Sequence, residues 1–197
     1  MNFESLRERE LQVCGYTLKI IPATIKYANE IYKIFSADVE NMIFWTPNGV
    51  FESPERALIS YYNRNRSLRS LMFGIFQDDK LLGEIGFSNV DERNGVCDVG
   101  YWLRKSARGK NIINKLLPRI EKLAFTQEWC HKLALHCDSE NIASKTIAEK
   151  NGYVLEGIIR QQSKWPNGSL RNKLYFGKLK SDITKRDNKS KTITKNH

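Results

Sequence analysis

Alternating apolar and polar positions indicate that the chain mixes strands and helices. Residues 16–20 alternate in the two-residue period of a strand and stop shortly before Pro22. Residues 24–38 instead repeat apolar positions at the spacing of a helix. A second helix is predicted to begin at Ser53 and Pro54, because serine is a favoured N-cap and proline suits the first turn.

The middle of the chain predicts three consecutive strands followed by a helix. The strands are expected at residues 71–76, 81–88 and 96–103, and the turn-forming residues between them favour an antiparallel meander. From about Lys110 the apolar positions change to helical spacing. Pro118 lies inside this helix and removes one backbone hydrogen bond, so we expect a kink there.

The last third predicts another strand at residues 132–137 and a short helix capped by Asn141. Two final strands are expected at residues 153–160 and 172–179. The order β-α-α-β-β-β-α-β-α-β-β predicts an α/β fold, with a mixed sheet of about seven strands and helices on its faces.

We expect one domain over residues 1–180, followed by a basic tail at residues 181–197. The formal net charge is +10, and the stretch from Lys178 to His197 contributes half of it, with seven basic and two acidic residues. Because the tail has few apolar residues, we expect it to be disordered. Two readings stay open: the tail contacts RNA or a ribosome electrostatically, or it is simply solvated.

Several classes of protein are disfavoured by composition. The chain has no run of 18 apolar residues and no apolar signal segment near its start, so we expect a cytoplasmic protein without a membrane span. Its four cysteines and three histidines lack the spacings of metal sites. We therefore expect no metal, and reduced, partly buried thiols.

Candidate chemistry concentrates in one strand–loop–helix segment, residues 99–117. A basic loop with the sequence RKSARGKNII leads directly into the helix. Free N–H groups and the positive end of the helix dipole make such a junction suitable for a phosphate. The segment has neither the P-loop spacing nor the dinucleotide-binding fingerprint, since Gly109 stands alone. An ordinary basic turn is the alternative interpretation.

The strings VGYWL, RKSARGKNII and CDSENIASKTIAEKNGYVLEG, in this order, resemble the GNAT superfamily of N-acetyltransferases. Within it, residues 16–180 are most similar to the ribosomal-protein N-acetyltransferase (RimJ/RimL-like) group. The resemblance implies a mostly antiparallel sheet and acetyl-CoA as the acetyl donor. It places Tyr101, Trp102 and Leu103 beside the pantetheine arm. It also assigns the pyrophosphate to the backbone of the loop formed by Arg108, Gly109, Lys110, Asn111, Ile112 and Ile113.

Asn111 departs from the family loop, which usually has a second glycine there. We place Asn111 in the first turn of the helix, where its side chain would be directed toward the phosphates. Glycine at this position is expected to tighten acetyl-CoA binding and, because it costs backbone entropy in a helix, to destabilise the free protein.

The resemblance also implies roles on the next helix. Asn141 is expected to contact the pantetheine and to cap the helix, while the Ser144 hydroxyl is expected to protonate the departing thiolate. Capping alone for Asn141 and a plain helix-start residue for Ser144 are the alternatives.

The general base stays open at this stage. Glu84 and Asp98 are candidates from neighbouring strands, with a structural role as the alternative for Asp98. His136 is another candidate, with packing under a helix as its alternative. Some members of the group carry a carboxylate where this chain has Ser163.

The expected acceptor is a protein N-terminus. An α-amine with a pKa of about 7.8 is roughly 400 times more neutral at pH 7 than a lysine amine, so it needs less help from a base. A small amine such as a polyamine, aminoglycoside or amino acid is the enzymatic alternative. A non-catalytic acyl-CoA-binding or RNA-associated module is the alternative from another class. A homodimer is compatible with each.

Overall fold

A computed structural model describes residues 6–42, 44, 51–165 and 167–183. Its regular helices are α2 (Ile25–Ser36), α3 (Val39–Met42), α4 (Pro54–Arg66), the 3-10 turn η1 (Lys105–Ala107), α5 (Ile112–Phe125) and α6 (Ile142–Lys150). Its strands are β1 (Leu11–Val13), β2 (Tyr16–Lys19), β3 (Leu71–Gln77), β4 (Lys80–Asp91), β5 (Val96–Leu103), β6 (Lys132–Asp138), β7 (Val154–Lys164) and β8 (Leu170–Leu179).

All the strands join one sheet in the order β1-β2-β3-β4-β5-β6-β8-β7. Every neighbouring pair is antiparallel except β5 and β6, which run parallel. The predicted mixed, mostly antiparallel sheet is therefore confirmed, with eight strands in the described part of the chain where about seven were expected. The sequence reading missed β1 and α3, which are too short to show a period.

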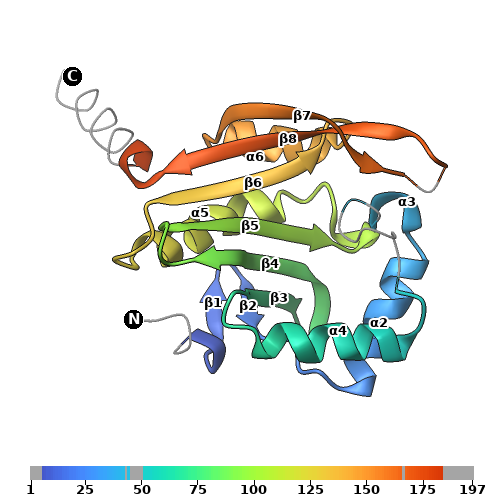
Figure 1. Ribbon diagram of the computed structural model, residues 1–197. Coiled ribbons are helices and arrows are strands. Elements are labelled where there is room, and N and C mark those ends of the chain that lie inside the picture. The colour runs from blue at the N-terminus through green and yellow to red at the C-terminus, as the bar shows by residue number, and fades with distance from the viewer. Residues whose placement is uncertain (1–5, 43, 45–50, 166, 184–197) are drawn as a thin grey trace.

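Helices cover both faces of the sheet (Figure 1), and each face has its own cluster of buried side chains. On one face, α5 and α6 cover β3 to β6 and β8 through residues such as Leu116, Phe73 and Leu133. On the other face, α2 and α4 pack on the ends of β3, β4 and β5, with Phe35 and Trp102 at the centre. Trp102 meets Phe35 edge to face, with ring centroids 5.1 Å apart.

The two predicted helix starts are confirmed by their N-caps. Ser53 accepts a hydrogen bond from the Arg56 N–H at 3.3 Å, and Asn141 accepts one from the Ser144 N–H at 3.0 Å. Gly152 follows α6 with a φ of +79°, the left-handed backbone that glycine adopts at a helix C-terminus. α5 continues through Pro118 from Ile112 to Phe125, and the kink expected there stays a prediction.

A helical segment follows β8, at the domain end expected near residue 180. Residues 180–183 are helical, and the partly buried Ile183 packs against the larger core. Residues 184–197, which form most of the basic tail, lie outside the described residues. Within the described residues, no helix is long and apolar enough to span a membrane.

Candidate active site

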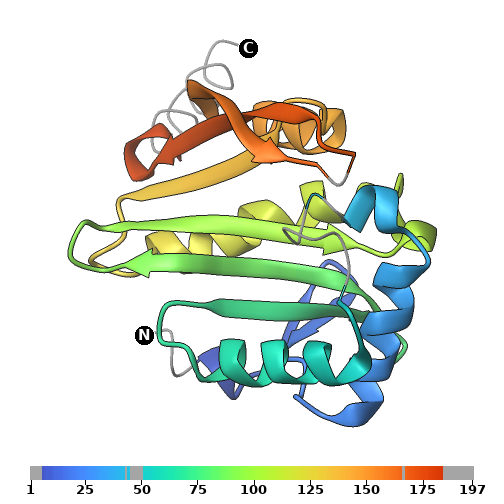
Figure 2. The same cartoon turned by 45° about the vertical axis from the view of Figure 1, so that its right-hand side comes forward.

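The sheet opens between β5 and β6. These parallel strands pair at only three positions, Val96 with Lys132, Cys97 with Leu133 and Asp98 with Ala134. Beyond them both strands continue, β5 to Leu103 and β6 to Asp138, each pairing only with its other neighbour. Figures 1 and 2 show the two strands diverging toward α3. The facing strand edges therefore present backbone N–H and C=O groups without sheet partners, and such groups require hydrogen bonds from elsewhere.

A cavity of about 200 Å³ occupies this opening, and we call it the cleft. Its walls come from β5, β6, the start of α5, the first turns of α6, and the α3 region. The lining residues are Asn41, Met42, Phe44, Val99, Gly100, Tyr101, Trp102, Leu103, Arg108, Ile113, Leu135, His136, Cys137, Asn141, Ala143, Ser144 and Ile147. The cleft thus crosses the sheet from the α3 side to the α5 and α6 side.

The loop between β5 and α5 holds its shape with two left-handed residues. Gly109 has a φ of +73°, and a Cβ there would meet no atom within 4 Å, so conformation rather than crowding favours glycine. Asn111 has a φ of +60° and precedes α5, which begins at Ile112. Our placement of Asn111 within the first helical turn was wrong. The position adopts the left-handed backbone, and asparagine is among the residues that tolerate it best.

The start of α5 has no side-chain cap. The Asn111 carboxamide oxygen accepts a hydrogen bond from the Asn114 side chain at 2.7 Å instead of from a backbone amide. The first turn also has no acidic residue. Its free N–H groups and positive dipole end suit an anion.

The expected loop residues divide between the cleft and the surface. Arg108 lines the cleft, pairs with the buried Asp38 and donates to the Leu103 carbonyl at 3.0 Å, so it fixes the loop to the end of α2. Ile112 is buried in the core, which leaves only its backbone for a ligand. Lys110 is exposed and does not line the cleft.

The hydroxyls of Tyr101 and Ser144 are neighbours on one wall of the cleft. Burial raises the pKa of the Tyr101 hydroxyl, and the neighbouring Ser144 hydroxyl opposes part of that rise. The Tyr101 hydroxyl is buried without a hydrogen bond to any described residue. A buried hydroxyl without a partner is costly, so this hydroxyl is suited to hydrogen-bond a ligand group in the cleft.

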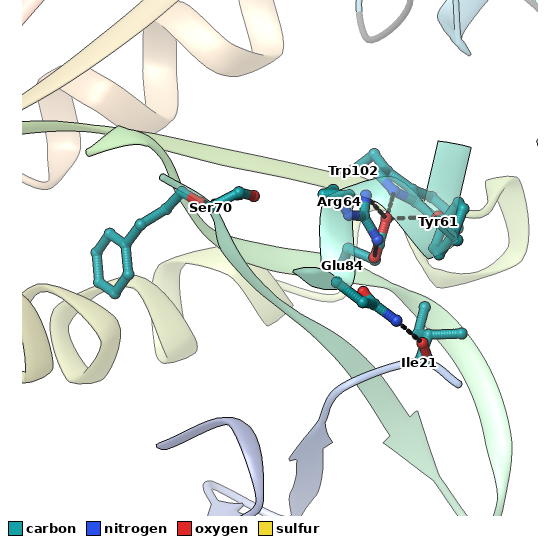
Figure 3. Close-up of polar contacts among 8 residues, drawn as sticks. Ile21, Tyr61, Arg64, Ser70, Glu84 and Trp102 are labelled. Carbon is teal, nitrogen blue, oxygen red and sulfur yellow. Dashed lines mark hydrogen bonds and ion pairs between the residues drawn. The ribbon is translucent and has the colours of Figure 1, made fainter. Parts of the chain in front are cut away.

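Glu84 lies outside the cleft, in a closed network between β4 and α4 (Figure 3). It is fully buried, and its carboxylate accepts hydrogen bonds from Tyr61 at 2.6 Å and from the Trp102 indole at 2.7 Å. Arg64 forms an ion pair with the same carboxylate. Because the carboxylate is fully buried and already paired with Arg64, Tyr61 and Trp102, this placement disfavours Glu84 as a base and favours a structural role.

Asp98 sits where the strands separate and does not line the cleft. It accepts a hydrogen bond from the Asn89 side chain at 2.7 Å. The His136 ring lies next to it, with Nδ1 3.8 Å from a carboxylate oxygen. Unlike Asp98, His136 does line the cleft.

The structure therefore gathers most of the expected ligand residues around one opening. Those that line the cleft are Tyr101, Trp102, Leu103, Arg108, Ile113, Asn141 and Ser144. Sequence reasoning missed the α3 residues and Cys137, because nothing local to them indicates the cleft. His136, one of the candidate bases, lines the cleft, and its alternation with the apolar Leu135 and Cys137 places it on the other face of β6. No group of three or more metal-binding side chains occurs among the described residues.

The fold and the site define a one-sheet α/β domain whose sheet is split by a cavity beside a helix N-terminus. The profile of the family described as "Acetyltransferase (GNAT) domain" matches residues 17–154. The chain belongs to this family, as its sequence motifs indicated.

Curated relatives include the ribosomal-protein-serine acetyltransferase of Escherichia coli, 32% identical over 90 residues, which are 46% of this chain and 50% of the relative. The putative ribosomal N-acetyltransferase YdaF of Bacillus subtilis is 28% identical over 115 residues, 58% of this chain and 62% of the relative. The chain thus spans between half and two thirds of the length of the curated relatives it matches.

Solved structures establish the same fold. RimL, a ribosomal L7/L12 α-N-protein acetyltransferase in complex with coenzyme A, superposes with a TM-score of 0.74 at 18% identity, covering 87% of this chain and 98% of that one. The microcin C7 self-immunity acetyltransferase MccE, in complex with acetyl-CoA and AMP, superposes with a TM-score of 0.72 at 22% identity, covering 84% and 93%.

Proposed function

We propose that this protein transfers an acetyl group from acetyl-CoA to a primary amine, and that the amine is the N-terminal α-amine of a protein. The observation that supports it most is the opening between β5 and β6, which leaves two strand edges unpaired around a cavity. An uncapped helix start lies at its rim. A long thioester with phosphates at one end and amides along its arm matches this arrangement of donors and acceptors.

Successive parts of the cleft match successive parts of acetyl-CoA, from the pyrophosphate along the pantetheine arm. The left-handed loop around Gly109 and the first N–H groups of α5 would hold the pyrophosphate. The free edge of β5 from Val99 to Leu103 would pair with the amides of the pantetheine arm, as an added strand does. Asn141, at the start of α6, would contact the arm from the other wall.

The chemistry needs an oxyanion site and an acid. Free N–H groups on the β5 edge would stabilise the oxyanion that forms when the amine adds to the thioester carbonyl. The Ser144 hydroxyl, on the cleft wall beside Tyr101, would give its proton to the sulfur as the carbon–sulfur bond breaks.

The proposed acceptor follows from the absence of carboxylates among the described lining residues. Without a carboxylate, the lining offers no negative charge to attract a polycation or a protonated lysine. An α-amine, with its pKa of about 7.8, supplies the neutral nucleophile at pH 7 far more readily than lysine does. The curated relative that acetylates ribosomal-protein serine supports the same acceptor class. Ribosome or RNA contact through the basic tail stays a prediction of the sequence.

Acetyl transfer from labelled acetyl-CoA to a matched set of acceptors tests the proposal. The set holds a peptide with a free N-terminal serine and one internal lysine, the same peptide with a blocked N-terminus, spermidine, and an aminoglycoside. We expect transfer to the free peptide and at least tenfold less to the blocked one. Faster transfer to spermidine or the aminoglycoside would establish the small-amine alternative. No transfer to any acceptor, despite acetyl-CoA binding, would establish the non-catalytic alternative.

A further inference from the structure

The cleft contains one described side chain that can accept a proton near neutral pH. Of its titratable lining residues, Arg108 stays charged, and burial raises the pKa of the Cys137 thiol to about 11. The pKa of Tyr101 is also raised by burial. These three groups hold their protons at pH 7, which leaves His136.

His136 contacts two neighbouring strands, and a third strand holds the carboxylate that it faces. Its ring stacks on Tyr175 of β8, with centroids 4.1 Å apart. Its Nδ1 faces Asp98 of β5 at 3.8 Å, an electrostatic contact longer than a hydrogen bond. Asn89 of β4, which holds a left-handed φ of +49°, donates to the same Asp98 oxygen at 2.7 Å. No described residue hydrogen-bonds the second ring nitrogen, Nε2, in this half-buried ring on the cleft wall.

The charges around His136 keep the ring neutral and orient it. Burial lowers the pKa of His136 most, Asp98 opposes this by raising it, and Lys173 of β8 lowers it further. The net direction is downward from about 6.5, so the ring carries no charge at pH 7. A carboxylate beside Nδ1 favours the tautomer with its proton on Nδ1, which leaves Nε2 as the free acceptor.

We infer that His136 is the general base of the proposed acetyl transfer and that Asp98 is its positioning residue. The inference rests on the proposed function. Nε2 takes the proton of the amine nitrogen as the new carbon–nitrogen bond forms. The electron pair of the carbon–sulfur bond leaves with sulfur, which is protonated from Ser144. His136 then releases its proton to solvent, and Ser144 takes a proton from solvent. Asp98 stabilises the transient imidazolium, as the carboxylate of a histidine–carboxylate pair does.

Replacing His136 by glutamine tests the base directly. We expect kcat to fall by about 100-fold or more, within the range for a lost general base, while the affinity for acetyl-CoA stays within threefold. His131→Gln is the matched control, because His131 is exposed just before β6 begins and does not line the cleft; its kcat should match the wild type. A His136→Gln variant that keeps kcat within threefold, or that loses acetyl-CoA binding, would overturn the assignment.

Two further readouts separate a base from a packing residue. His136→Ala should regain activity with added imidazole, and it should not with a neutral osmolyte of equal size. Asp98→Asn should shift the acid limb of the kcat–pH profile to lower pH, because its charge raises the pKa of His136, while the ionisation of the acceptor amine is unchanged. No rescue and an unmoved limb would contradict the pairing. A wild-type protein that binds no acetyl-CoA would instead refute the proposed function.

Discussion

Substitutions at Asn111 test whether left-handed backbone preference or helix propensity determines stability at the position before α5. Asn111 holds a φ of +60° and a ψ of +21°, and its side chain accepts a hydrogen bond from Asn114 at 2.7 Å. Glycine adopts this backbone freely, asparagine tolerates it, and alanine does not. We therefore expect the order of stability at this position to follow left-handed preference rather than helix propensity.

The magnitudes can be worked out from these two contributions. Alanine tolerates the left-handed backbone less well than asparagine, and Asn111→Ala also removes an exposed hydrogen bond. Together these two changes lower the free energy of unfolding by about 1–2 kcal/mol. Asn111→Gly loses the same hydrogen bond and increases the entropy of the unfolded chain, both of which destabilise the fold. Glycine also adopts the left-handed backbone without strain, so the net loss in free energy of unfolding is about 0.5 kcal/mol or less. Helix propensity alone predicts the opposite order, with alanine the most stable.

Denaturant and thermal unfolding of the three proteins without ligand measure the difference. For a chain of this size 1 kcal/mol corresponds to about 2–4 °C, so alanine should lower Tm by about 2–8 °C and glycine by less than about 2 °C. Asn114→Ala sets an upper limit on the cost of the lost hydrogen bond, because it also removes the bond that Asn114 accepts from the Asn151 side chain at 2.8 Å. An alanine variant at least as stable as wild type would refute the reasoning.

Three other changes test separate parts of the account. Ser144→Ala should lower kcat by about 10–100-fold with acetyl-CoA affinity within threefold, and an unchanged kcat would reduce Ser144 to a helix-start residue. Glu84→Gln should destabilise the fold by about 2–4 kcal/mol, because it leaves Arg64 without its buried partner, while kcat of the folded protein falls less than threefold; a 100-fold loss would restore Glu84 as a base. Deleting residues 184–197 should leave Tm and acetyl-CoA affinity unchanged, and failure to fold would show the tail to be part of the domain.

The sequence predicts most of the fold because long elements repeat their pattern several times. The fourteen residues of α5 place Leu116, Leu117 and Ile120 in the core as their spacing requires. The three residues of β1 and the four of α3 each cover little more than one period, so no repeat can be recognised, and only their tertiary neighbours define them. α3 nevertheless borders the cleft through Asn41 and Met42, so this part of the site could not be predicted from the hydrophobic pattern.

The site was less predictable than the fold because side-chain roles depend on which strand edges separate. The sequence does not distinguish Glu84 from Asp98 as a candidate base. In the structure, the pairing of β5 with β6 ends at Asp98, whereas Glu84 is buried in an ion pair with Arg64. The left-handed backbone of Asn111 likewise has no local sequence signal, and only the resemblance to the family loop implies a glycine there. This backbone explains why asparagine can replace that glycine.

The most direct test of the central claim is a titration of the full chain with acetyl-CoA, measured by calorimetry and by thermal unfolding. If the opening between β5 and β6 is the binding site, one molecule should bind per chain, and acetyl-CoA at 100 times Kd should raise stability by about 2.7 kcal/mol, or Tm by about 5–11 °C. Ser144→Trp, which places a large ring in the cleft beside Tyr101, should abolish the shift while remaining folded. No heat and no Tm shift at millimolar acetyl-CoA, or equal binding by Ser144→Trp, would contradict the account.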